Sequence, residues 1–140
     1  MSHQWIDPNT CQSLAVLVDS VAGPLLVEHS AAVCLEVDID PSVKIPADPV
    51  HTADLIAALV KQSLLEMPSG GDLTFSCCQT DLGVELEVAD TGSAVESRAT
   101  RLPLAAAVIG AAVTWQNCPQ GGAAATVKFH RAEGSGRMAA

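Results

Sequence analysis

The sequence from Val84 to Gly92 reads VELEVADTG, in which apolar and acidic residues alternate up to a short polar turn. A period of two is typical of a β-strand with one buried face and one solvent-exposed face. The preceding stretch 73–78 predicts a second strand, and Asp81-Leu82-Gly83 predicts the turn that joins the two. Residues 73–88 are therefore predicted to form a hairpin, and Asp90-Thr91-Gly92 closes its second strand.

Two helices and one strand are predicted upstream of this hairpin. Apolar residues recur at helical spacing between Thr10 and Ser30, although Gly23-Pro24 should kink or interrupt that helix. Residues 33–39 alternate again and predict a strand. Asp48-Pro49 resembles an N-cap followed by a proline in the first helical turn, and a helical apolar stripe continues from there to about Met67. Residues 68–71 (PSGG) then end the helix.

A short helix and a second hairpin are predicted downstream. The alanine-rich stretch 104–112 has little polar surface and should be a well-buried helix, packed against the sheet through its alanines. Residues 113–117 and 124–130 predict two strands around a turn at 119–122. The predicted fold class is α/β (α+β): a two-layer sandwich in which helices pack on one face of a mixed β-sheet of about five strands. One domain should span residues 11–131, between an N-terminal extension (1–10) and a flexible tail (132–140).

Composition narrows the classes of function. The 140 residues are 49% hydrophobic, and a net charge of −9 with only seven Lys and Arg argues against nucleic-acid binding. No apolar run reaches the roughly 18 residues of a membrane span, and Met1–Trp5 is unlike the start of a signal peptide. A cytoplasmic protein without membrane attachment is expected. Five cysteines without a CxxC pair predict free, mostly buried thiols.

The order of several short motifs carries a family resemblance. Asp48-Pro49, Gln62-Ser63, Gly70-Gly71, Asp90-Thr91-Gly92 and Gly121-Gly122 follow one another at intervals that resemble the ATP-binding domain of sensor histidine kinases, the Bergerat fold. The resemblance extends from about Cys11 to Arg131. It implies the two-layer fold predicted above, together with ATP and Mg²⁺ as cofactors and a role in signal transduction.

The resemblance also assigns candidate site residues. Asp90 falls on the carboxylate that accepts from the adenine amino group, and Gly92 on the glycine that lets the backbone approach the base. Gln62 and Ser63 fall on the motif that binds Mg²⁺. Gly121 and Gly122 fall on the turn of the closing hairpin. The alternative interpretation of Asp90-Thr91-Gly92 is an ordinary turn that ends a strand.

Two departures from the family pattern affect the metal and the chemistry. Gln62 stands where the family has the magnesium-binding Asn, and its longer stem should weaken a metal site that demands tight octahedral geometry. Lys61 stands where the family has an acidic residue, and lysine is not a general base unless its pKa is strongly lowered. We therefore predict no catalytic residue, and no detectable hydrolysis.

Further departures affect phosphate binding. The second glycine of the adenine motif is Ala94, and the segment that follows is shorter than the family's ATP lid. The glycine-rich start of the next helix is replaced by residues 101–104 (RLPL), and Pro103 has no N–H to offer a phosphate. Arg98 and Arg101 could supply replacement positive charge, but we expect both to be solvated arginines on a loop.

Three functions are compatible with this pattern. The first is a degenerate ATPase that binds nucleotide weakly or not at all and acts as a regulatory module with a signalling protein as partner. The second is an active stand-alone kinase that phosphorylates a partner in trans, since none of His3, His29, His51 and His130 has the context of a phosphoacceptor. The third is a scaffold domain without nucleotide. The altered phosphate and metal positions favour the first.

Overall fold

The computed structural model describes residues 12–130, which form three α-helices, one 3-10 turn and five strands. The predicted extension (1–10) and tail (132–140) lie outside the described residues. In chain order the elements are α1 (Leu14–Glu28), β1 (Val33–Asp38), α2 (Pro49–Leu65), β2 (Gly71–Thr80), β3 (Gly83–Asp90), η1 (Val95–Ser97), α3 (Leu104–Val108), β4 (Ala112–Asn117) and β5 (Ala123–His130).

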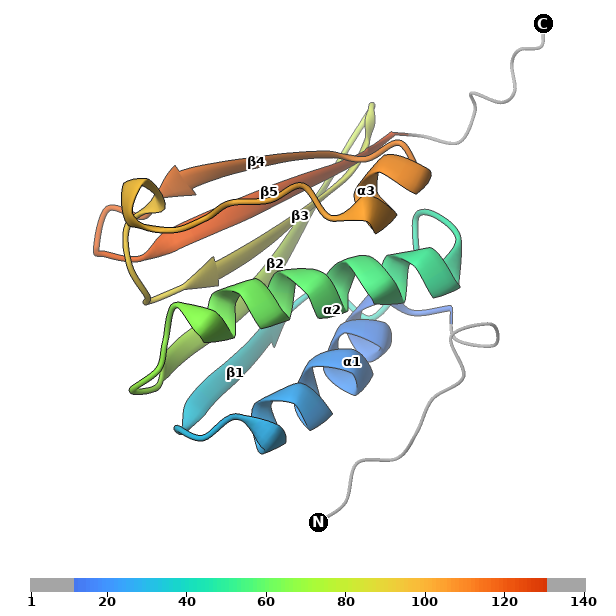
Figure 1. The fold of residues 1–140 in the computed structure, drawn as a ribbon. Helices are drawn as coiled ribbons and strands as arrows, with labels where there is room; N and C mark the ends of the chain where they lie inside the picture. The colour runs from blue at the N-terminus through green and yellow to red at the C-terminus, as the bar shows by residue number, and fades with distance from the viewer. Residues whose placement is uncertain (1–11, 131–140) are drawn as a thin grey trace, which may run out of the picture.

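The five strands form one mixed sheet in the order β1-β2-β3-β5-β4. The β1–β2 pair is parallel and the other three pairs are antiparallel. Figure 1 shows α1 and α2 side by side across one face of the sheet, with α3 on the same side near β4 and β5. This arrangement confirms the predicted two-layer α/β sandwich.

The core lies between the sheet and the two long helices. Side chains on α2 at helical spacing are fully or almost fully buried, and so are alternate residues of β2, β3 and β5. The alternation works because inward-facing positions recur every second residue along a strand. The buried side chains of these elements include Leu55, Ile56, Leu59, Leu73, Phe75, Leu86, Val88 and Phe129.

The proline in α1 does not interrupt the helix, contrary to one of the two outcomes predicted. Ser13 caps the N-terminus by accepting from the Val16 N–H at 3.4 Å, and the helix continues through Pro24 to Glu28. Proline inside a helix removes one backbone hydrogen bond. The buried faces of Leu17 and Val18 supply the tertiary packing that holds the helix together.

The helix α2 begins as its sequence predicts. The Asp48 carboxylate accepts from the His51 backbone N–H at 2.9 Å and contacts His51 Nδ1 at 2.7 Å. This cap fixes the first turn, with Pro49 as the first helical residue. At the far end of α2, Gln62 and Ser63 lie beside Asp90 at the end of β3.

The prediction that residues 104–112 form a short, well-buried helix is wrong in its C-terminal end and in its burial. The helix stops at Val108 because Gly110 adopts a left-handed conformation (φ +71°), and the Ala111 N–H donates to the Ala106 carbonyl at 2.9 Å. These are the features of a glycine C-cap. Only Ala106 is buried within the helix, whereas Leu104 is 80% exposed, and the helix packs mainly on α2 rather than on the sheet.

The prediction that the cysteines are mostly buried is also wrong. Cys34 and Cys78 are exposed, while Cys77 and Cys118 are half-buried, and all four are free thiols. Cys34 and Cys78 occupy strand positions that face away from the helices. That open face of the sheet is polar, and most of its ionisable groups are acidic: Glu36, Asp38, Asp72, Glu85 and Glu87, beside Lys128.

Ala106→Leu should lower the free energy of unfolding by about 1–3 kcal/mol, because the new side chain enters a fully packed contact between α3 and α2. The matched control is Ala107→Leu, one residue along, where the side chain is exposed and the change should be within about 0.5 kcal/mol. Urea unfolding of both variants measures the difference. Equal midpoints for the two variants would contradict the packing of α3.

Candidate functional site

The site is built around Asp90, the last residue of β3. The Asp90 carboxylate is buried and accepts two hydrogen bonds from the Arg98 guanidinium, at 2.8 Å from Nη1 and 2.9 Å from Nη2. The Gly92 N–H donates to the same carboxylate at 2.9 Å. The side chains of Arg98 and Asp90 are 6% and 2% exposed, so this is a buried, bidentate ion pair.

Opposing effects act on the pKa of Asp90. Burial raises this pKa, whereas hydrogen bonds from Arg98, Ser63 and Gly92, together with the charge of Arg98, lower it. The lowering effects prevail, so the pKa of Asp90 lies below its ordinary value. In turn, the hydrogen bond with Asp90 raises the pKa of Arg98 against the opposing effect of its burial. Both groups are therefore charged at neutral pH, and each neutralises the other.

The space beside this ion pair is almost filled. The remaining cavity is about 10 Å³, which is roughly the space that one water molecule needs. The guanidinium of Arg98 and the indole of Trp115 lie among the side chains that close it. Its lining consists of Leu59, Gln62, Ser63, Val88, Asp90, Arg98, Trp115 and Ala125.

Residues 91–103, which we call the covering loop, join β3 to α3 and carry Arg98. Figure 1 shows this segment on the same face of the sheet as α2. Hydrogen bonds connect the loop to α2 and to β4. Ser93 Oγ donates to Glu66 Oε1 at the end of α2, and the Val95 N–H donates to Asn117 Oδ1 on β4 at 2.8 Å. Arg98 also donates to the Ser93 carbonyl, within the loop itself.

The predicted metal and phosphate positions face the covering loop. Gln62 Nε2 donates to the Arg101 carbonyl at 3.0 Å, so the amide is engaged with protein backbone. Lys61 is exposed. Pro103 occupies the N-cap position of α3, which has only five residues. Within residues 12–130, no group of three or more His, Cys, Asp or Glu side chains is arranged to hold a metal ion.

The glycines of the predicted site meet protein atoms. A Cβ on Gly92 would lie 2.5 Å from the Glu66 carbonyl oxygen, so this glycine lets the covering loop approach the end of α2. A Cβ on Gly122 would lie 1.9 Å from the Asp90 carbonyl oxygen, so the turn between β4 and β5 packs directly against the end of β3. Gly121 is exposed, with nothing within 4 Å of its Cβ position.

The structure thus brings Asp90, Gly92, Gln62 and Ser63 together, while Gly121 lies outside the cluster. The expectation that Arg98 is solvated is wrong, and Arg101 is exposed as expected. Sequence reasoning also missed Trp115, Glu66 and Asn117. Arg98 follows Asp90 by eight residues on a segment without regular periodicity, so no local pattern shows which way its side chain points.

ATP and Mg²⁺ do not fit this closed site. A cavity of about 10 Å³ cannot take a purine, and the acceptor atoms of Asp90 are already bound by Arg98. On the phosphate side, Pro103 offers no N–H and the Gln62 amide is bound to the Arg101 carbonyl. From the side of α2, nucleotide could reach the Asp90 carboxylate only if the covering loop moved.

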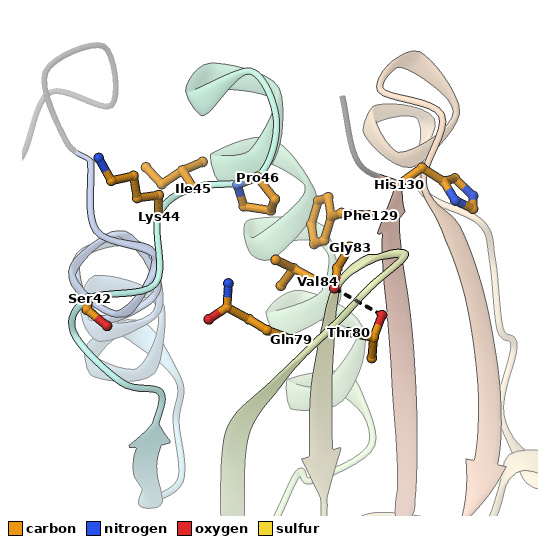
Figure 2. Close-up of a pocket in the computed structure, with 10 residues that line it drawn as sticks. All are labelled: Ser42, Lys44, Ile45, Pro46, Gln79, Thr80, Gly83, Val84, Phe129 and His130. Atoms are coloured by element: carbon orange, nitrogen blue, oxygen red, sulfur yellow. Dashed lines mark hydrogen bonds between the residues drawn. The ribbon is translucent and has the colours of Figure 1, made fainter. Parts of the chain in front are cut away.

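Among the larger cavities of the described residues, two lie at the two ends of β3. One, of about 450 Å³, is at the opposite end of β3 between the loop after β1 and the β2–β3 hairpin. Figure 2 shows Phe129 and Pro46 facing each other there, with the charged end of Lys44 and the ring of His130 pointing away from the middle. The other, of about 360 Å³, lies beside the end of β3 and is lined by Asp90 as well as by Asp72 and Gly121. Within the described residues, no helix has the length and apolar character needed to cross a bilayer.

Comparison with known proteins finds similar structures but no matching sequence family and no matching curated sequence. The mycobacterial sensor histidine kinase MprB superposes with a TM-score of 0.66 at 16% identity, over 85% of this chain and 97% of the other. The ATP-binding domain of PrrB from Mycobacterium tuberculosis gives 0.62 at 19% identity, over 85% and 94% of the chains.

A third similar structure is the catalytic domain of histidine kinase ThkA in a nucleotide-free form, with a TM-score of 0.66 at 13% identity, over 85% of this chain and 94% of that domain. These superpositions establish the architecture. At such low sequence identity they say nothing about the chemistry, which has to be argued from the residues of the site. Residues 12–130 therefore have the fold of the ATP-binding domain of histidine kinases.

Proposed function

We propose that this protein is a histidine-kinase-type ATP-binding domain that no longer catalyses phosphotransfer and acts in signal transduction as a regulatory module that binds another protein. The observation that carries the proposal is the buried Asp90–Arg98 ion pair. The carboxylate assigned to adenine is occupied by a side chain of the same protein.

The phosphate side of the site supports the same proposal. Catalysis of phosphoryl transfer depends on positioning the phosphates and neutralising their charge. Here Gln62 is bound to the Arg101 carbonyl, Pro103 precedes a helix of only five residues, and Lys61 is exposed. These positions offer neither a tight metal ligand nor a row of free backbone N–H groups. A kinase acting in trans would need both.

Nucleotide binding should be weak and should come from the base. We expect ATP, ADP and adenosine to bind with similar dissociation constants on the order of millimolar, or about 4 kcal/mol. Mg²⁺ should change these values little, and hydrolysis should be undetectable. Isothermal titration calorimetry with each ligand, with and without Mg²⁺, measures the constants. Micromolar binding of Mg-ATP, clearly tighter than adenosine, would instead support the active kinase.

Two variants identify the atoms responsible. Asp90→Asn should abolish the remaining binding, because an amide presents a donor where adenine needs an acceptor. Asp72→Asn is the matched control, since Asp72 is an exposed carboxylate at the start of β2 and its replacement should leave binding unchanged. Circular dichroism should first establish that both variants are folded at the titration temperature. If Asp90→Asn and Asp72→Asn bind nucleotide equally well, Asp90 is not the residue that binds the base.

A further inference from the structure

Arg98 occupies the acceptor site of Asp90 as a ligand would. Its planar guanidinium presents two N–H groups to the two carboxylate oxygens, with contacts of 2.8 and 2.9 Å. The side chain comes from the covering loop rather than from the sheet or from α2. Asp90, in contrast, is fixed at the end of β3, where Ser63 and the Gly92 N–H also bond to its carboxylate.

The ion pair is not a strong lock. Removing two charges from water offsets much of the attraction between them, so a buried pair contributes little net stability. In addition, Nε of Arg98 is buried without a hydrogen-bond partner among the described residues. An unsatisfied buried donor destabilises the state that buries it. In the closed state, the Arg98 guanidinium therefore makes two well-aligned hydrogen bonds to Asp90, while its own Nε is buried without a partner.

The covering loop has the features of a segment that can open as a unit. All of its residues except Pro103 are exposed or half-buried, and several hydrogen bonds hold it to the rest of the protein. Polar contacts near the surface are the ones that open at low free energy. The contacts to be broken are Arg98–Asp90, Ser93–Glu66, Val95–Asn117, Asn117–Glu96 and Gln62–Arg101.

We propose that Arg98 is a built-in occupant of the Asp90 pocket, so that the covering loop is an autoinhibitory strap which must swing out before a ligand reaches Asp90. The choice of adenine as that ligand rests on the function proposed above. The strap itself rests on the contacts of Arg98. A ligand must then supply the free energy of opening, and its apparent association constant equals the intrinsic constant multiplied by the fraction of molecules in the open state.

The first test removes the occupant. Arg98→Met keeps the length and packing of the stem but removes all five donors. Adenosine should bind this variant at least about tenfold tighter than the parent protein, since opening no longer breaks an ion pair. The matched control is Arg101→Met, an exposed arginine of the same loop, which should leave the affinity unchanged. Calorimetry measures all three proteins.

The second test does not depend on nucleotide. Arg98→Ala leaves a vacant guanidinium site beside Asp90, so methylguanidinium at tens of millimolar should raise the melting temperature of this variant. Methylammonium at the same ionic strength should not, because it lacks the planar pair of donors. The double variant Asp90→Asn/Arg98→Ala should show no such selectivity. If Arg98→Ala is unfolded, selective refolding by methylguanidinium is the equivalent result.

The two tests separate the strap from the proposed function. If methylguanidinium stabilises Arg98→Ala no more than methylammonium does, the strap is overturned. If the selective stabilisation is found while adenosine binds Arg98→Met no tighter than the parent protein, the strap is supported and adenine binding, as part of the proposed function, fails. Success in both tests supports the strap and its ligand together.

Discussion

Asp90→Asn should lower the free energy of unfolding by about 3 kcal/mol. Removal of one partner from a buried ion pair leaves an uncompensated charge, which typically costs about 3–5 kcal/mol. We expect the lower end of this range because Arg98 lies on a loop and can turn toward solvent once its partner is lost. Urea unfolding followed by circular dichroism measures the change, with Asp72→Asn as the exposed control at less than about 0.5 kcal/mol.

A double variant tests whether the lost stability comes from the Asp90–Arg98 ion pair. Arg98→Met in the Asp90→Asn background removes the charge left behind, so it should recover about 1 kcal/mol or more of the lost stability. The two single substitutions would then be strongly non-additive. Additive effects of the two substitutions, or a loss below about 1 kcal/mol for Asp90→Asn, would show that the ion pair has little influence on the fold.

Acidification should reproduce part of this effect. The pKa of Asp90 is lowered in the folded protein, so folding favours its ionised form. Its contribution to stability is complete above the unfolded pKa of about 3.9 and disappears as the pH falls through the lower folded value. The stability of the parent protein should therefore decline below about pH 4 more steeply than that of Asp90→Asn.

Gly122→Ala should destabilise the protein by about 3 kcal/mol or more, through two additive causes. Gly122 has a φ of +86°, a conformation that L side chains rarely adopt. Its Cβ would also lie 1.9 Å from the Asp90 carbonyl oxygen, and backbone atoms at the end of a strand cannot move aside cheaply. For a domain of this size the loss corresponds to a fall of roughly 10 °C in melting temperature.

Gly121→Ala is the matched control for this prediction. Gly121 also has a positive φ, of +106°, but nothing lies within 4 Å of its Cβ position. This variant should show only the backbone strain, about 1–2 kcal/mol. Differential scanning calorimetry of the two variants then separates strain from the contact with Asp90. Equal melting temperatures would mean that the turn does not press on the end of β3.

Much of the architecture was predictable because its signals are local. The alternation in 33–39 and 84–88 predicted strands with one buried face, and Asp48-Pro49 predicted the start of α2. One error arose where tertiary packing outweighed a local rule, and another where a local stop signal was overlooked. Packing of Leu17 and Val18 carries α1 through Pro24, and the left-handed Gly110 ends α3 four residues earlier than its alanine content suggested.

Hydrophobic period and turn residues along the chain were enough to predict the two-layer fold. Asp90, Gly92, Gln62 and Ser63 were grouped as a candidate site through the family resemblance that the order of the motifs carries. What these residues contact is visible only in the three-dimensional structure. Arg98 lies on an irregular loop, and its direction depends on where β3, α2 and β4 meet in space. Sequence periodicity carries no information about such a meeting point, and there the Asp90 carboxylate is bound by the protein's own arginine.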